Sequence, residues 1–392
     1  MLKKTVILCL ALICVAGLSG WLAFPTPVDA TPAEPVQQKI KELIRNKETA
    51  VNQKDKKRFL SVLNPSYPFY VQEQKRWFED AVRWVDPGSY RLRVISMIPE
   101  KEHQIRAWVE QRYTRQGRVF AIRFPLLFQE TEKGWKDSDF PFLHTTRGNV
   151  VIRYTDEGLR EQASIALESA HKAIQELGRK MDWTPRHSIE VKIYHRPELF
   201  RQSVKPSLPA WAGGWHESGE SVKLIGAKGF SDQQFISSVL VHEMTHMMVS
   251  DTTGDNAAYW LQEGAAEYFQ THLLPGLRTQ EEKKYEKPRW RMSRLEKLNL
   301  EHLHEEEASH YYTQCYQLFR YLMNTYGEKK VRRLFSVLQL SPEEDKETVD
   351  KISLVNQRTR EAVKKVFGKS LAEIERDWIR DMKKKKSTLA AG

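Results

Sequence analysis

The segment from Asp232 to Ser250 restricts the fold of this chain more than any other part of the sequence. Apolar residues occupy much of its helical circumference, which is typical of a helix buried in a protein core. A capping box formed by Ser231 and Gln234 predicts where this helix begins. His242 and His246 stand four residues apart on it, so their imidazoles lie one turn apart on the same face and can converge on one metal ion.

The spacing of the two histidines suits zinc, which accepts imidazole nitrogens in a tetrahedral arrangement. Glu243 follows the first histidine and can lean toward the open face of the metal, where a carboxylate can take a proton from a bound water. The five-residue pattern also arises by chance, so a zinc site requires a third ligand. The alternative is a pair of core histidines whose nitrogens bond to backbone groups.

The next predicted helix, Ala257 to Leu273, supplies that third ligand in Glu263. Packed against the first helix, it would complete a set of two nitrogens and one oxygen around zinc, with water in the fourth position. Small residues at positions 264–266 allow close approach of helices. Glu267, one turn further along, could accept the hydrogen of the outer ring nitrogen of a ligand histidine. A solvent-exposed Glu267 is the alternative.

The motifs HEMTH at residues 242–246 and WLQEGAAEY at residues 260–268 resemble those of the gluzincin peptidases, and especially of the bacterial peptidase MA-like domains. The likeness runs from about residue 150 to residue 380. It implies a zinc metallopeptidase in which Glu263 is the third ligand and Glu267 supports a ligand histidine. The metzincin pattern does not fit, because Val249 and Thr252 stand where glycine and histidine would be needed.

The resemblance does not extend to the aminopeptidase branch of the gluzincins. Sixteen residues separate His246 from Glu263, fewer than is usual in that branch, and Ala212-Gly213-Gly214 stands where its GAMEN motif would be. We therefore expect an endopeptidase rather than an aminopeptidase.

Related enzymes place a tyrosine that hydrogen-bonds the tetrahedral oxyanion near the start of the helix predicted over Tyr311 to Tyr326. Tyr312 is the first candidate and Tyr311 the second, with ordinary packing of both as the alternative. We expect the substrate peptide to lie extended along an edge strand near Val222 to Ile225. The predicted substrate-binding residues are Gly213, Gly214, Val222 and Leu224.

The predicted fold class is α+β with two domains, because helices and strands are segregated along the chain. Helices over 36–51 and 72–84, followed by strands over 90–98, 104–113 and 118–130, resemble the NTF2-like cone fold, in which a curved antiparallel sheet wraps around helices. Pro125 implies a bulge or a sheet edge in the third strand. The NTF2-like domain is predicted over 36–145, and its fold names no function.

The gluzincin-type domain is predicted over 146–386, with a small sheet and a mostly helical C-terminal part, followed by a tail at 387–392. Its strands are expected from Val150, over 189–194 and over 222–225, with a long helix over 156–180. Helices are expected over 232–250, 257–273, 311–326 and 370–382, with charged connectors between them.

The first 30 residues predict export. Lys3 and Lys4 precede an uncharged run over 5–24, and Val28-Asp29-Ala30 form a small-x-small cleavage pattern. The run is also long enough to anchor the chain in a membrane, so a cleaved signal peptide and a retained anchor both stay open. A linker at 31–35 follows. We expect a bacterial protein that is either extracellular or anchored to the outer face of the cytoplasmic membrane.

Cys315 is the one cysteine outside the apolar run, so the exported part has no disulfide framework, which suits a bacterial exported protein.

The net charge of +11 arises from basic residues scattered among acidic ones, and Lys383 to Lys386 form the only basic run. No nucleic-acid motif accompanies it, so the expected partner is a peptide or protein substrate. The partner of the N-terminal domain is not indicated. Two other functions remain open: a catalytically silent surface or assembly protein with a structural zinc site, and a nonpeptide hydrolase on the same metal site.

Overall fold

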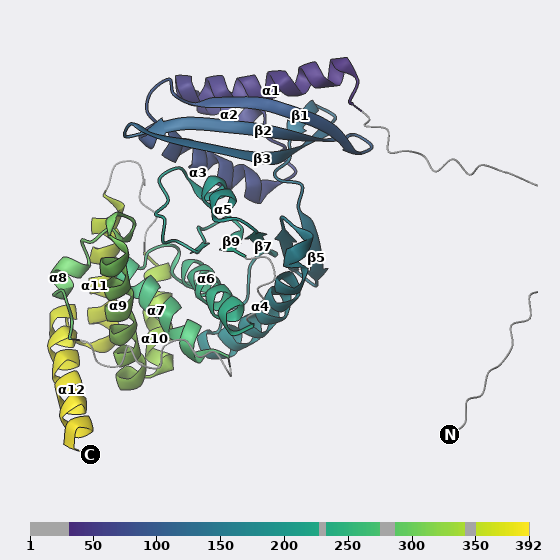
Figure 1. The fold of residues 1–392 in the computed structure, drawn as a ribbon. Coiled ribbons are helices and arrows are strands. Elements are labelled where there is room, and N and C mark those ends of the chain that lie inside the picture. The colour runs from purple at the N-terminus through teal and green to yellow at the C-terminus, as the bar shows by residue number, and fades with distance from the viewer. Residues whose placement is uncertain (1–30, 227–232, 275–286, 342–349, 392) are drawn as a thin grey trace, which may run out of the picture.

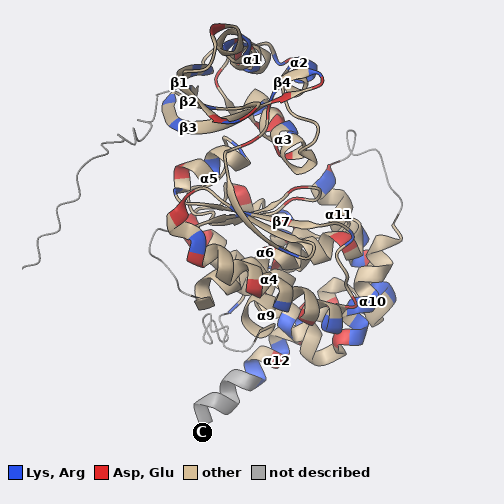
Figure 2. Ribbon diagram, turned by 90° about the vertical axis from the view of Figure 1, so that its right-hand side faces the viewer, with Lys and Arg blue, Asp and Glu red and all other residues tan. Residues whose placement is uncertain are grey.

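The computed structural model describes residues 31–226, 233–274, 287–341 and 350–391. The predicted signal peptide or anchor, with its apolar run over 5–24, lies outside these residues, and so does Ser231 of the predicted capping box. No helix in the described ranges combines the length and the apolar character needed to cross a bilayer. Figures 1 and 2 show the N-terminal region above a second sheet, with the C-terminal helices below.

The N-terminal region, residues 34–142, packs three helices with a four-stranded antiparallel sheet in the order β1-β2-β3-β4. Apolar side chains alternate along β2, so one face of the sheet joins the helices in a core, with Ala107 and Val109 fully buried. Its likeness to the NTF2-like cone stays a prediction. The elements are α1 (Glu34–Gln53), α2 (Lys56–Ser61), α3 (Pro68–Trp84), β1 (Arg91–Lys101), β2 (Gln104–Arg115), β3 (Arg118–Thr131) and β4 (Gly134–Asp137).

Pro125 lies at an edge of this sheet and not in a bulge. It pairs in regular register with Trp108 of β2, while β4 pairs only with the 128–131 end of β3. A proline is tolerated there because the missing N–H faces no partner strand.

The second sheet has five strands in the order β5-β6-β7-β9-β8. β6, β7 and β9 are parallel to one another, whereas β5 and β8 run antiparallel at the two edges. The strand over 222–225 forms as predicted, but its predicted place at the edge of the sheet is wrong, because β8 pairs with the outer side of β9. The elements are β5 (Leu143–Arg147), β6 (Val150–Tyr154), α4 (Arg160–Met181), β7 (Ile189–Tyr194), α5 (Pro197–Val204), β8 (Gly214–Trp215) and β9 (Val222–Ile225).

Both faces of this sheet are buried. Ile189, Val191 and Ile193 of β7 face the core that includes α4 and α6, while Tyr194 joins the core of the N-terminal region. Segment 197–212, which includes α5, contributes apolar side chains to that same N-terminal core. The N-terminal region and the second sheet therefore share one packed interface.

The remainder of the chain is helical, as predicted, but it contains more helices than the periodicity indicated. α10 and α11 occupy stretches that we predicted to be charged connectors. Each helix buries one apolar stripe and exposes many charged residues, and these charges made the stretches resemble connectors. α12 runs through Ala391, into the predicted tail, and α1 begins inside the predicted linker. The helices are α6 (Gln233–Thr253), α7 (Tyr259–His272), α8 (Met292–Leu295), α9 (Glu305–Tyr326), α10 (Glu328–Gln339), α11 (Lys351–Phe367) and α12 (Leu371–Ala391).

Candidate metal centre

The two histidines of the HEMTH segment lie on α6, which is apolar around most of its circumference and packs against α4, α7, α10 and the second sheet. Met244, Met248 and Val249 are fully buried on this helix. His242 and His246 are partly exposed, because their side of the helix faces a cavity. The burial of the rest of α6 fixes the direction in which both imidazoles point.

Three side chains from α6 and α7 bring metal-binding atoms together. Nε2 of His242 and Nε2 of His246 are 3.2 Å apart. Oε2 of Glu263 lies 3.5 Å from the first nitrogen and 3.4 Å from the second. A tetrahedral zinc ion with bonds of about 2.0–2.1 Å separates its ligand atoms by about 3.3–3.4 Å, so the triangle matches one face of such a site.

Glu263 supplies a second observation that fits a metal ion. Its Oε2 is buried and accepts no hydrogen bond from any described residue. A buried carboxylate oxygen without a partner is costly, and coordination of a cation would remove that cost. The residues present therefore fit zinc.

The three ligands are also coupled electrostatically. Burial alone would raise the pKa of Glu263, but His246 and His242 outweigh it and lower the pKa to about 2. Burial alone would lower the pKa of His242, but Glu263, Glu243 and Glu267 raise it to about 10. In the absence of metal, His242 is thus protonated at neutral pH and carries the positive charge that balances the carboxylates.

His242 is oriented through its outer ring nitrogen. Nδ1 donates to Oε1 of Gln270 at 2.8 Å, and Oε1 of Glu267 is further away at 3.6 Å. This arrangement leaves Nε2 free to face a metal. Glu267 therefore lies near the predicted nitrogen, but the hydrogen-bond acceptor there is Gln270, which the sequence analysis missed. The signal was present, because Glu263, Glu267 and Gln270 share one face of α7.

Glu243 lies between the metal ligands and strand β8. Its side chain is buried, and burial raises its pKa above the ordinary value, although His242 and His246 act in the opposite direction. A raised pKa suits a carboxylate that both accepts and returns a proton near neutral pH.

Gly264 lets α7 pack closely against α9. A β-carbon on Gly264 would lie 2.6 Å from the carbonyl oxygen of Cys315 and 3.0 Å from Cβ of Phe319. This packing brings Tyr312 to the cavity, with its ring centroid 6.1 Å from that of His242. Tyr311 is 1% exposed and points into the core. Of the two candidate tyrosines, only Tyr312 lines the cavity.

A cavity of about 810 Å³ opens beside the three ligands. Gly213, Gly214 and Leu224 line it as the sequence placed them, whereas Val222 is fully buried and does not line the cavity, because its side chain faces the core. Further lining residues that the sequence analysis did not single out are Trp211, Trp215, His216, Tyr259 and Asn299. These residues follow no periodic pattern, so no sequence signal marked them.

His216 stands out among the residues that the sequence analysis missed. Its Nδ1 is buried and has no hydrogen-bond partner among the described residues. Burial, with smaller effects of His246 and Arg76, lowers its pKa to about 3. The imidazole is therefore neutral over the physiological range.

In a comparison with known protein families, the family model described as the Peptidase MA superfamily matches residues 169–383, which is more than half of the chain. This match includes all of α6, α7 and α9, and it begins within α4, after the N-terminal region. No curated protein matches the sequence.

Proposed function

This chain belongs to the Peptidase MA superfamily, and from that membership and the geometry of the site we propose that it is a zinc-dependent endopeptidase. The observation that carries the proposal is the triangle of His242, His246 and Glu263, whose atoms are spaced as the ligands of a tetrahedral ion. The triangle borders a cavity large enough for several residues of a peptide.

His242 and His246 would hold the ion through two nitrogens and Glu263 through one oxygen, beside the cavity. When bound, zinc would lower the pKa of a coordinated water and polarise the carbonyl of a peptide bond. Gln270 keeps the His242 ring in the orientation that this binding needs.

Glu243 is the proposed general base. Its carboxylate accepts the proton of the attacking water and then donates it to the nitrogen of the leaving group. Tyr312 is the proposed donor to the oxygen that becomes negative in the transition state. Burial raises the pKa of Tyr312 well above the ordinary value, so its hydroxyl keeps its proton and remains a donor.

The substrate backbone is proposed to bind along β8. Ile225 donates from its N–H to the carbonyl of Gly213, so the next pair, Gly214 opposite Leu224, is a pair without mutual hydrogen bonds. The N–H and C=O of Gly214 then point away from β9 and are available to an extended peptide. This mode of binding recognises the main chain of the substrate and does not require a pocket for its terminal amine. It therefore supports an endopeptidase, which cleaves within a chain.

The test compares the wild-type protein with Glu243→Gln. We expect about one zinc per chain in both, cleavage of an unfolded protein such as casein by the wild type, and loss of that cleavage with a chelator. The variant should lose roughly 10²–10⁴-fold in kcat, the contribution of a positioned general base. Stoichiometric zinc without any peptide hydrolysis would instead favour a structural zinc site in an assembly protein.

We also propose that the chain is exported, on the basis of its basic start, its apolar run over 5–24 and the small residues at Val28 and Ala30. The mature N-terminus distinguishes the two forms. Protein isolated from its native host should begin near Thr31 if the segment is a cleaved signal peptide, and near Met1 if it is a retained anchor.

A further inference from the structure

β8 and β9 form a hairpin that makes up one side of the cavity. We call residues 213–225 the cleft hairpin: β8 is its outer strand, residues 216–221 are its tip, and β9 attaches it to the second sheet. β8 lies against α6 at Glu243, and residues 213–218 line the cavity. The position of this hairpin therefore sets where a bound peptide lies relative to the general base.

The tip of the cleft hairpin is held by α3 of the N-terminal region. The guanidinium of Arg76 donates to the carbonyl oxygen of Ser218 at 2.8 Å and to Oε1 of Glu220 at 3.1 Å. Its Nη1 also lies 3.4 Å from Oε2 of Glu217, which lines the cavity. One planar side chain thus contacts three successive parts of the tip, a geometry that lysine cannot reproduce.

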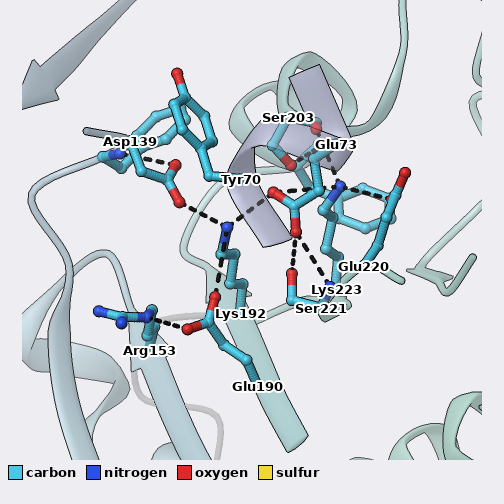
Figure 3. A network of polar contacts seen from close by, with 12 residues as sticks. Tyr70, Glu73, Asp139, Arg153, Glu190, Lys192, Ser203, Glu220, Ser221 and Lys223 are labelled. Atoms are coloured by element: carbon cyan, nitrogen blue, oxygen red, sulfur yellow. Dashed lines mark hydrogen bonds and ion pairs between the residues drawn. The ribbon is translucent and has the colours of Figure 1, made fainter. Parts of the chain in front are cut away.

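A second contact from α3 fixes the base of the tip. Oε1 of Glu73 accepts hydrogen bonds from the backbone N–H of Ser221, at 3.2 Å, and from its hydroxyl. The other oxygen of Glu73 accepts from Nζ of Lys192 on β7 at 2.8 Å, and Lys223 of β9 lies 3.7 Å away. Figure 3 shows Glu73 between these lysines and Ser221.

This network is buried, which makes it rigid. The side chains of Lys192 and Lys223 have no exposed surface, and that of Glu73 is 2% exposed. Charges out of reach of water must keep their partners, because an unpaired buried charge is strongly destabilising. The contacts of Glu73 with the base of the hairpin therefore cannot be replaced by solvent.

The interior of the N-terminal region leaves little room for a ligand. The enclosed space among Tyr70, Trp77, Gln111 and Gln202 has a volume of about 20 Å³, enough for one water molecule. Gln202 belongs to α5, which closes this side of the core. The apolar side chains of α5 thus pack this interior against the second sheet.

We infer that the N-terminal region is a fixed part of the substrate-binding machinery, in which Arg76 and Glu73 of α3 are positioning residues that hold the cleft hairpin beside Glu243. The inference rests on the proposed function, since its consequence is the alignment of a peptide for hydrolysis. The zinc ligands lie on α6 and α7, which α3 does not hold, so peptide binding and metal binding should respond differently to changes in α3.

The test uses the full chain with Arg76→Gln, which removes the charge from a side chain that is 30% exposed and should leave the protein folded. Arg83→Gln is the matched control, because Arg83 is an exposed arginine of the same helix that contacts the ring of Trp84. Two measurements are made: amide hydrogen exchange over residues 214–225, and KM and kcat for a peptide substrate.

In Arg76→Gln we expect the hairpin amides to exchange roughly 10-fold faster, because the tip opens more often. KM should rise roughly 5- to 30-fold, the effect of losing one or two hydrogen bonds, while kcat and zinc content stay near those of Arg83→Gln. Arg76→Lys should recover only part of the loss, since lysine keeps the charge without the fork.

Unchanged exchange of the hairpin in Arg76→Gln would overturn the inference whether or not the protein cleaves peptides. An unchanged KM in an active enzyme would overturn it as well. In another outcome, the hairpin exchanges faster in Arg76→Gln than in the wild type while the wild type cleaves no peptide. That result would overturn the proposed function, but the conclusion that α3 holds the hairpin would stand.

Discussion

The main chain of Gly214 in β8 lies directly against the side chain of Glu243 in α6, so that a β-carbon on Gly214 would be 2.9 Å from Cδ of the glutamate and closer still to Oε1. Real β-carbons essentially never approach another atom so closely, so the carboxylate would have to move. Glycine is thus needed at this position because a larger residue would collide with Glu243, the proposed general base, and not because of the backbone conformation.

Gly214→Ala should inactivate the enzyme without removing its metal. The added methyl group displaces the Glu243 carboxylate, and kcat should fall roughly 10²-fold or more, because a positioned general base contributes about 10²–10⁴-fold. Zinc content should stay near one per chain. Gly213→Ala is the matched comparison, since a methyl group there meets nothing within 4 Å, and its loss of kcat should be far smaller. Equal activity of the two variants would contradict the packing.

Tyr312→Phe and Tyr311→Phe should separate catalysis from stability. Tyr312 lines the cavity, so loss of its hydroxyl should lower kcat roughly 10²–10³-fold, the usual effect of removing one oxyanion donor. Tyr311 lies in the core, so loss of its hydroxyl should cost about 1 kcal/mol of stability with kcat near the wild-type value. Steady-state kinetics and thermal unfolding of both variants provide the measurement. A large loss of kcat in Tyr311→Phe, with a normal kcat in Tyr312→Phe, would make Tyr311 the oxyanion donor.

The affinity for zinc should rise with pH. His242, with a pKa of about 10 in the metal-free site, holds a proton at neutral pH that zinc must displace, whereas Glu263, with a pKa of about 2, is already ionised. Release of one proton per ion makes the association constant grow about tenfold per pH unit, or about 100-fold between about pH 6 and about pH 8. Competition against a chromophoric chelator measures this slope, and an affinity independent of pH would disprove the protonation of His242.

Lys192→Met should destabilise the protein, and more so at higher pH. Lys192 lies 2.8 Å from Glu73 and 2.6 Å from Asp139, so its loss leaves buried carboxylates without a cation and should cost roughly 3–5 kcal/mol. Lys56→Met is the control, because Lys56 is 44% exposed in its pair with Glu79 and should contribute about 0–1 kcal/mol. Urea unfolding of both variants gives the comparison.

The pH dependence of Lys192→Met has a definite sign. Burial raises the pKa of Asp139 to about 6 even beside Lys192, and it acts on Glu73 in the same direction, although Lys192 and Lys223 there outweigh it. Without Lys192 the pKa of Asp139 rises further above that of the unfolded chain and the pKa of Glu73 rises as well, so the folded state binds more protons than in the wild type. The stability of the variant is then retained at low pH and lost as the pH rises, and the deficit should be smaller near pH 5 than near pH 8. A deficit that grows toward low pH would contradict this account.

Local patterns in the sequence were enough to predict most elements near the site. β7 and β9 have the predicted bounds, and α6 and α7 differ from the predicted helices by a few residues at their ends. The pairing of His242 with His246 follows from the helical repeat alone, because four residues make about one turn. Glu263 required more, namely the resemblance of two motifs and the packing of α7 on α6.

Several features could not be predicted because they depend on contacts between distant residues. β8 has only two residues, too few for a periodic signal, so β9 was mistaken for the edge of the sheet. Tyr311 and Tyr312 are neighbours, and only the rotation of α9 against α7, set at Gly264, decides which one faces the cavity. Lys192 and Lys223 alternate with apolar residues, as they would in a strand with one wet face, yet the N-terminal region buries both.

The sequence by itself determined most of the helices and strands around the site, which residue types could bind zinc, and that two of the proposed ligands share one helical face. These are properties of spacing within a single element, and they follow from backbone geometry. The tertiary structure decided which strand borders the cavity, which tyrosine reaches it, that Gln270 orients His242, and that α3 holds the cleft hairpin. Each of these depends on burial and on distances between atoms far apart in the chain, which are fixed only when separate elements pack together.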